Sequence, residues 1–152
     1  MTERLFILNG PNLNMLGRRE PDLYGRITLA EIQKRCQAVA EELDFDLFFE
    51  QSNSEGELIG WVHQAYEEAA SVIINPAGLS TRSVALFDAL RMLRRPVVEV
   101  HLTNIFAREP LYRDLLTATA AWGFLAGFGA DVYELGMRAL AGRRSETDQP
   151  WT

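Results

Sequence analysis

The sequence has few residues of the kinds that bind metals or form covalent cross-links. One cysteine, Cys36, and two histidines, His63 and His101, occur in 152 residues. A single cysteine forms no disulfide within its own chain, so we expect Cys36 to be a structural thiol in a reducing cytoplasm. Zinc sites need clusters of cysteine and histidine at short spacings, and the sequence shows no such cluster. We therefore expect no metal site.

Long apolar runs and an excess of positive charge are also missing. No apolar stretch approaches the roughly 20 residues that a membrane-spanning helix needs. The N-terminus lacks the basic region and long apolar core of a signal peptide. The formal net charge is -6, which disfavours non-specific binding to the anionic backbone of a nucleic acid. These absences predict a cytoplasmic protein without a membrane or nucleic-acid partner.

Three common motifs of nucleotide-binding and hydrolytic sites are absent. No lysine follows a spaced pair of glycines, which excludes a phosphate-binding loop. The turn after the first predicted strand lacks the glycine pattern of dinucleotide-binding folds. No serine lies in a nucleophile elbow, which disfavours a catalytic serine triad.

What the sequence does contain is an alternation of short apolar runs and helical patterns. Thr28 followed by Glu31 is typical of a capping box at a helix start, and the apolar residues of 29–43 recur at helical spacing. Short runs such as Val72-Ile73-Ile74 are typical of buried strands. We predict strands at 5–8, 45–49, 72–74, 97–100 and 117–124, and helices at 28–43, 58–70, 83–93 and roughly 130–141.

Strands that alternate with helices are typical of a parallel sheet covered on both faces. Right-handed crossovers leave few topologies, and we predict a flavodoxin-like α/β three-layer sandwich with a five-stranded parallel sheet in the order 2-1-3-4-5. The chain length fits one domain. We expect a single domain over residues 1–142 and a disordered, polar tail over 143–152.

One long stretch, residues 9–25, directly follows the first predicted strand. Its prolines, glycines and asparagines disfavour helix and strand, so we predict a loop without regular structure. Loops this long in compact domains are usually functional or disordered. This loop contains Arg18, Arg19 and Tyr24. The alternative is an ordinary surface loop.

Polar residues follow each of the first four predicted strands. Parallel strands end at one edge of the sheet, where α/β proteins bind ligands. We therefore expect these segments to form one concave site. The segments are 9–25, 51–57, 75–82 and 101–108.

Two groups of residues in these segments suit proton transfer. Tyr24 shares its loop with Arg18 and Arg19, and nearby positive charge favours the ionised form of a tyrosine, which is a competent general base. Glu99 and His101 are two residues apart on a predicted strand and point to the same face. A carboxylate beside an imidazole fixes its tautomer and keeps it protonated, as a general acid requires. The alternative for His101 is a histidine bonded to backbone at a strand end.

A series of short motifs runs along the chain. They are NGPNLN (9–14), LGRREP (16–21), YG (24–25), QSNSEG (51–56), INP (74–76), DAL (88–90), EVHL (99–102) and NIFARE (104–109). Together these motifs resemble the type II 3-dehydroquinate dehydratase family. They follow the order of the family from residue 5 to about residue 140, and together they are far more specific than any one of them.

The resemblance implies a flavodoxin-like fold and a homo-oligomer, a dodecamer built from four trimers. It implies an enzyme that removes water from 3-dehydroquinate, a small anionic cyclic substrate, by anti elimination through an enolate and without a cofactor. Tyr24 would remove the proton beside the ketone, and Arg19 would favour its ionisation. Asn12 would hold the water that stabilises the enolate oxygen. His101, backed by Glu99, would protonate the departing hydroxyl.

The resemblance also implies a set of substrate-binding positions. Asn75 and the backbone amides of Leu102 and Thr103 would bind the substrate carboxylate, and Asp88 would reach the site of a neighbouring subunit. The full set is Asn75, Thr81, Asp88, Leu102, Thr103, Arg108, Tyr112 and Arg113.

Two of these positions depart from the family pattern. The family usually has histidine where this chain has Thr81 and arginine where it has Tyr112, and both family residues contact ring hydroxyls of the substrate. Arg82 and Arg113 are each one residue away, which on a helix is about 100° of rotation, so neither is an automatic replacement. Two further positions depart, Leu79 and Phe106, which are commonly tyrosine and histidine.

Three functional hypotheses follow. The first is a lyase acting on 3-dehydroquinate or on a related cyclic β-hydroxy ketone that bears a carboxylate. The second is a non-catalytic relative that binds a small carboxylate, which the retained acid and base residues disfavour. The third is a flavodoxin-like nucleotide-binding or receiver module, which the missing phosphate loop and the missing acidic pocket disfavour.

Overall fold

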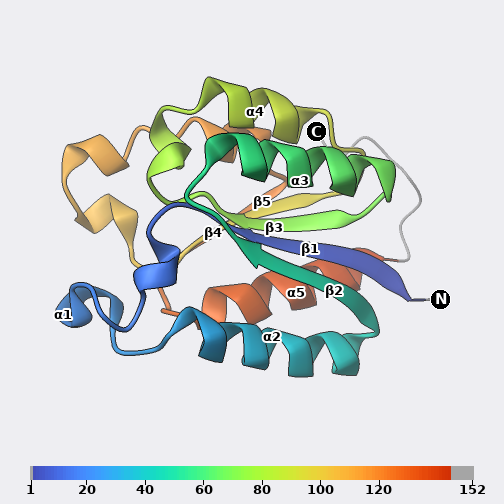
Figure 1. Cartoon of the computed structure of the whole chain (residues 1–152), viewed down its shortest axis with the longest axis horizontal. Coiled ribbons are helices and arrows are strands. Elements are labelled where there is room, and N and C mark those ends of the chain that lie inside the picture. The colour runs from blue at the N-terminus through green and yellow to red at the C-terminus, as the bar shows by residue number, and fades with distance from the viewer. Residues whose placement is uncertain (1, 145–152) are drawn as a thin grey trace.

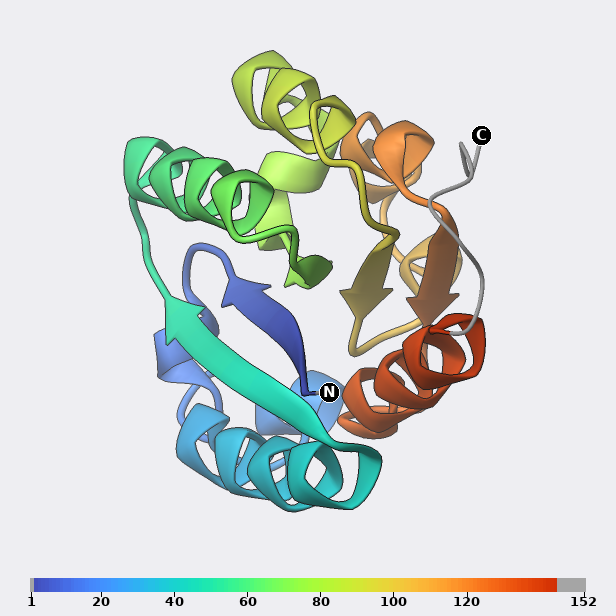
Figure 2. The ribbon, with the colours of Figure 1, turned by 90° about the vertical axis from the view of Figure 1, so that its right-hand side faces the viewer.

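A computed structural model of the protein describes residues 2–144 and contains one parallel sheet (Figures 1 and 2). Its order, β2-β1-β3-β4-β5, confirms the predicted flavodoxin-like topology. Strand β1 lies between β2 and β3 and pairs with both. The strands are β1 (Glu3–Asn9), β2 (Phe45–Gln51), β3 (Ser71–Asn75), β4 (Val97–His101) and β5 (Gly123–Ala126).

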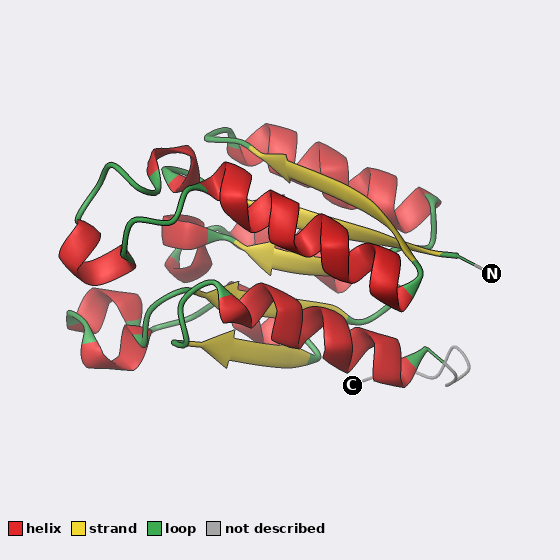
Figure 3. Cartoon of the chain, turned by 90° about the horizontal axis from the view of Figure 1, so that it is seen from below, coloured by secondary structure: helices red, strands yellow, loops and turns green. Residues whose placement is uncertain are grey.

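Helices cover both faces of this sheet, two on each face (Figures 1 and 3). Leu5 and Ile7 of β1 pack under one helix pair, whereas Phe6 and Leu8 pack under the other. All four side chains are fully buried, and each contributes about 1.5–3 kcal/mol to folding by leaving water. The pairs are α2 (Leu29–Leu43) with α5 (Asp131–Arg143) and α3 (Glu55–Glu67) with α4 (Val84–Arg91).

The single cysteine belongs to the layer between the sheet and α2. Cys36 is fully buried in the core cluster that includes Val132 and Tyr133 of α5. Burial raises the pKa of the Cys36 thiol to about 12, because a thiolate is poorly solvated there. The structure therefore keeps this thiol protonated and unreactive at neutral pH.

Serine and threonine caps fix where three helices begin. The Thr28 hydroxyl accepts from the backbone N–H of Glu31 at 3.2 Å, as the capping-box pattern predicted. Ser54 and Ser83 cap α3 and α4 in the same way. The predicted range 58–70 for α3 was wrong by about three residues, because the Ser54 cap starts the helix at Glu55. The range 83–93 shortens to Val84–Arg91.

Residues 9–25 are not wholly irregular, which corrects the prediction. They contain a 3-10 helix, Leu13–Met15, and the four-residue helix α1, Pro21–Tyr24 (Figure 1). Pro21 occupies the first helical position, where its fixed φ suits a helix and its missing N–H is not needed. Tyr24 is the last residue of α1, so this short helix fixes the position of the Tyr24 backbone.

The strand predicted at 117–124 was wrong over its first half. Thr117–Ala120 is a 3-10 helix, and β5 begins only at Gly123. The Leu116 N–H donates to the Ser80 carbonyl at 2.8 Å, which turns this segment away from the sheet. The Trp122 N–H then donates to the Val97 carbonyl at 2.8 Å and starts the ladder with β4.

Residues 143 and 144, the first two of the predicted tail, belong to the folded part of the chain. Helix α5 continues to Arg143, and the Arg144 guanidinium donates to the Leu43 carbonyl at 2.7 Å and to Glu3 at 2.9 Å. The rest of the predicted disordered tail, 145–152, lies outside the described residues. Within residues 2–144, no helix has both the length and the apolar character needed to cross a membrane.

Candidate active site

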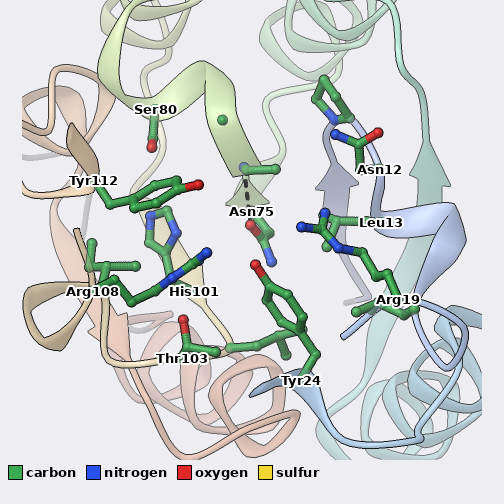
Figure 4. Close-up of a pocket in the computed structure, with 16 residues that line it drawn as sticks. Asn12, Leu13, Arg19, Tyr24, Asn75, Ser80, His101, Thr103, Arg108 and Tyr112 are labelled. Atoms are coloured by element: carbon green, nitrogen blue, oxygen red, sulfur yellow. Dashed lines mark hydrogen bonds between the residues drawn. The ribbon is translucent and has the colours of Figure 1, made fainter. Parts of the chain in front are cut away.

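A cavity lies at the carboxyl ends of β1, β3 and β4, where the polar segments were expected to meet (Figure 4). It contains about 740 Å³ of space, part of it open to solvent. Most of the predicted site residues line it. These are Asn12, Arg19, Tyr24, Asn75, His101, Leu102, Thr103, Arg108 and Tyr112.

Tyr24 projects into the middle of the cavity between two arginines (Figure 4). The Arg19 guanidinium carbon lies 4.8 Å from the Tyr24 ring centroid, and that of Arg108 lies 5.5 Å away. Cations at these distances are attracted to an aromatic ring. Arg19 also forms an ion pair with Glu20 at 3.0 Å, with both side chains partly exposed, which contributes about 0–1 kcal/mol. The two cationic groups therefore flank the phenol that was predicted to act as a base.

His101 and Glu99 form a buried pair on one face of β4. The His101 Nε2 and a Glu99 carboxylate oxygen are 2.8 Å apart, and Glu99 is fully buried. His101 therefore bonds to a carboxylate, so the alternative of a histidine bonded only to backbone is wrong. Within residues 2–144 its other ring nitrogen, Nδ1, has no hydrogen-bond partner, and the ring lines the cavity. This arrangement leaves one ring nitrogen for a ligand.

The Asn75 amide is held in one orientation from behind. Its oxygen accepts from the Ala77 N–H at 3.1 Å, and its NH₂ group donates to the Tyr133 hydroxyl at 3.3 Å. The Tyr133 hydroxyl in turn donates to the Asn9 side-chain oxygen at 2.6 Å. Burial raises the pKa of Tyr133, so this hydroxyl remains a donor. An amide NH₂ has two hydrogens, so one remains for a ligand in the cavity.

The turn after β1 depends on a glycine and on a left-handed asparagine. A side chain at Gly10 would place its Cβ 2.6 Å from the Pro76 carbonyl oxygen, so this close approach requires glycine. Asn12 has φ 73°, a conformation that asparagine tolerates better than most residues. Its backbone N–H donates to the Asn53 side chain at 2.9 Å. The segment after β2 therefore supports the site without lining the cavity.

Thr81 does not line the cavity, whereas its neighbour Ser80 does. Both lie in a 3-10 helix, Ala77–Thr81, where one residue is about 120° of rotation. The Thr81 hydroxyl instead donates to the Gly78 carbonyl at 3.4 Å. Sequence reasoning missed Ser80, because finding it required the phase of this short helix.

Asp88 and Arg113 also lie outside this cavity. Asp88 is on the exposed side of α4, so its predicted role at a neighbouring subunit stays a prediction. The Arg113 guanidinium donates to the Arg108 carbonyl at 2.9 Å. The Arg108 guanidinium lies 4.1 Å from the Tyr112 ring centroid, and Tyr112 lines the cavity. Arg108 therefore contacts both aromatic rings of the site, Tyr24 and Tyr112.

Two arginines, Arg19 and Arg108, line the cavity, and no carboxylate is among the lining residues. Within residues 2–144, no three His, Cys, Asp or Glu side chains are grouped as a metal site requires. Arginine and amide side chains donate hydrogen bonds to anions. The cavity therefore suits a small anionic organic molecule, with a phenol and an imidazole placed to move protons.

Comparisons with known proteins agree with this chemistry. The family model described as Dehydroquinase class II matches residues 3–141. The 3-dehydroquinate dehydratase of Brucella abortus (strain S19) is 48% identical over 149 residues, covering 98% of this chain and 95% of that protein. The 3-dehydroquinate dehydratase of Phenylobacterium zucineum is 48% identical over 142 residues, covering 93% and 98%. The type II dehydroquinase structure from Propionibacterium acnes superposes with a TM-score of 0.91 at 40% identity, covering 93% and 98%.

Proposed function

Because this chain belongs to the class II dehydroquinase family, we propose that it is a hydro-lyase that converts 3-dehydroquinate to 3-dehydroshikimate and water. One observation supports this most directly. Tyr24, flanked by Arg19 and Arg108, shares a cavity with His101, which is bonded to the buried Glu99. A base and an acid in one cavity are what an elimination of water requires.

The proposed reaction has two proton transfers. The Tyr24 phenolate accepts the proton from the carbon beside the ketone, and the electron pair of that C–H bond moves to form an enolate. Asn12, through a water molecule, stabilises the enolate oxygen. The enolate then reforms the ketone and expels the β-hydroxyl, which accepts a proton from His101 and leaves as water. The departing groups lie on opposite faces of the ring, which is an anti elimination.

The substrate carboxylate is assigned to the part of the cavity at the ends of β3 and β4. Asn75 has one free amide hydrogen, and the backbone N–H groups of Leu102 and Thr103 lie at the end of β4. A carboxylate bound there holds the ring at fixed distances from the base and the acid, which lowers the entropy cost of the reaction. Arg108 and Arg19 add positive charge around the anion.

A second candidate substrate is a related cyclic β-hydroxy ketone that bears a carboxylate. One observation favours it: Tyr112 lines the cavity with its ring against Arg108, while Thr81 does not line the cavity. The resemblance implies that these positions normally contact ring hydroxyls. A site that lacks those contacts suits a substrate with a different hydroxyl pattern.

Incubation with 3-dehydroquinate, and in parallel with an analogue that lacks one ring hydroxyl, tests the two candidate substrates. Dehydration creates a conjugated enone, so ultraviolet absorbance should rise with time and with protein concentration. A protein without turnover on 3-dehydroquinate, but with turnover on an analogue that lacks one ring hydroxyl, would favour the second candidate. A protein that binds either compound without converting it would contradict the enzymatic function and support a binding role.

The assembly and location belong to the same proposal. We infer a cytoplasmic homo-oligomer, a dodecamer of four trimers, as the resemblance implies. Leu23 and Phe128 are exposed apolar side chains that line a second hollow beside Tyr24. Exposed apolar surface near a site is typical of a protein–protein interface, which supports self-association. Asp88, exposed on α4, is available to a neighbouring copy.

A further inference from the structure

Glu99 has a second buried partner that the proposed reaction does not use. One carboxylate oxygen bonds to His101 at 2.8 Å, and the other accepts a hydrogen bond from the Thr117 hydroxyl at 2.5 Å. We propose that Thr117 is a positioning residue that holds the Glu99 carboxylate and thereby orients the imidazole of His101. This inference rests on the proposed function, in which His101 is the acid.

The burial of these groups makes the Thr117 contact important. Glu99 and Thr117 have no exposed surface, and His101 is 7% exposed. A buried carboxylate without hydrogen bonds is strongly destabilised, because no water solvates it. His101 bonds to one carboxylate oxygen and Thr117 to the other. Removing the Thr117 hydroxyl therefore leaves one oxygen without a hydrogen bond and allows the carboxylate to rotate about its Cγ–Cδ bond. The imidazole would then lose its fixed partner.

The Thr117 hydroxyl also has an alternative acceptor. The Ser80 carbonyl oxygen lies 3.5 Å from it, at the limit of a hydrogen bond. A hydroxyl both donates and accepts. The Glu99 oxygen, at 2.5 Å, is the nearer acceptor, so the hydroxyl hydrogen is directed to the carboxylate.

The backbone around Thr117 is fixed to the wall of the cavity. The Leu116 N–H donates to the same Ser80 carbonyl at 2.8 Å, and Ser80 itself lines the cavity. Thr117 begins the 3-10 helix Thr117–Ala120, which precedes β5 beside β4. The hydroxyl is thus held by three elements, β4, the Ser80 helix and its own helix, and is not a mobile surface group.

The test compares three variants by steady-state kinetics. Thr117→Val removes the hydroxyl at nearly constant shape. It should lower kcat by about 10–100-fold, which is the effect of losing a hydrogen bond to a charged group. KM should stay within about twofold of the wild-type value, because Thr117 does not line the cavity. Thr117→Ser keeps the hydroxyl and should restore most of kcat. Thr119→Val is the matched control, because its hydroxyl donates to the Leu116 carbonyl at an exposed position. An unchanged kcat in Thr117→Val would overturn the proposal.

A spectroscopic measurement separates positioning from general damage. The chain has two histidines, His101 in the site and His63 on the exposed surface of α3. In protein with ¹⁵N-labelled histidine, Thr117→Val should shift the ring signals of His101 and leave those of His63 in place. Equal shifts at both histidines, or a large loss of thermal stability that Thr117→Ser does not repair, would indicate a structural role and contradict the proposal.

The same measurement distinguishes two kinds of failure. If the unaltered protein does not convert 3-dehydroquinate or a related hydroxy ketone, the proposed function is wrong. The His101 signals of the substrate-free protein still decide whether Thr117 positions the pair. Unshifted His101 signals in Thr117→Val would then overturn the inference without any activity measurement.

Discussion

At the scale of single residues, the Tyr24 hydroxyl is the group whose loss should matter most. Tyr24→Phe removes the predicted base and leaves the ring between Arg19 and Arg108. Loss of a positioned base typically lowers the rate about 10²–10⁴-fold, so we expect kcat to fall by that factor with little change in KM. Turnover is followed by enone absorbance on the substrate that proves active.

The chain offers a matched control for that variant. Tyr66 also lies beside an arginine, with the Arg94 guanidinium 4.7 Å from its ring centroid, but it does not line the cavity. Tyr66→Phe should therefore keep wild-type turnover. Near-normal activity in Tyr24→Phe would remove Tyr24 from the catalytic role.

Thr81 and Tyr112 provide a second prediction at this scale. Each missing contact to a buried hydroxyl costs about 1–3 kcal/mol, which is up to about a hundredfold in efficiency per contact. The double variant Thr81→His with Tyr112→Arg should raise kcat/KM on 3-dehydroquinate by at least about tenfold. Each single variant, assayed alongside, shows whether the gain needs both side chains.

The opposite result is equally informative. If the unaltered protein already matches ordinary family members in kcat/KM on 3-dehydroquinate, and the double variant is no better, then these departures are neutral and the second candidate substrate is wrong.

The sequence predicted some site residues and missed others for a physical reason. Glu99 and His101 follow strand alternation, and Tyr24 lies in one recognisable loop, so local pattern was enough. Thr117 was predicted only as part of a strand. Its partners, Glu99 and Ser80, are 18 and 37 residues away in the chain, and no periodicity shows a contact of that kind.

At the scale of elements, helix α5 supports the site through Tyr133, which shares a core cluster with the cavity residues Leu13 and Leu102. Tyr133→Phe removes the hydroxyl between Asn75 and Asn9, so the Asn75 NH₂ group and the Asn9 side-chain oxygen each lose a buried partner. We expect a loss of about 1–3 kcal/mol in the free energy of unfolding and a raised KM, because the Asn75 amide is freed. Denaturant unfolding and steady-state kinetics measure the two effects. A variant with lower stability but an unchanged KM would show that the hydroxyl supports the fold alone.

Helices were easier to predict than the last strand because their signals are local. Thr28 with Glu31 and the apolar spacing of 29–43 gave α2 almost to the residue. Residues 117–120 also have strand-like composition, but the Ser80 carbonyl holds their backbone in a 3-10 turn. Whether this segment forms a strand or a 3-10 helix therefore depends on a tertiary hydrogen bond, which local propensity does not predict.

At the scale of the whole molecule, alternation and handedness left a few possible strand orders, of which the predicted order 2-1-3-4-5 is confirmed. The assembly was predicted from the resemblance alone. We expect light scattering to give a mass many times the 17.2 kDa of one chain at micromolar concentration. Leu23 and Phe128 are exposed beside the site, so a charge introduced at Phe128 should weaken the assembly. A stable monomer would contradict this prediction.

Because Cys36 is buried, its reaction with a thiol reagent reports local unfolding of each chain. Its thiol is inaccessible and its pKa is about 12 in the folded state, so a thiol-specific reagent at pH 8 modifies it only when α2 leaves the sheet. Because no other cysteine competes, the labelling rate measures that opening directly, in every subunit of an assembly and without an added probe. Leu13, Leu16 and Leu102 line the cavity and belong to the same core cluster as Cys36. Comparing this rate with and without a bound substrate analogue would give the free energy that occupancy of the cavity adds to the packing of α2 on the sheet.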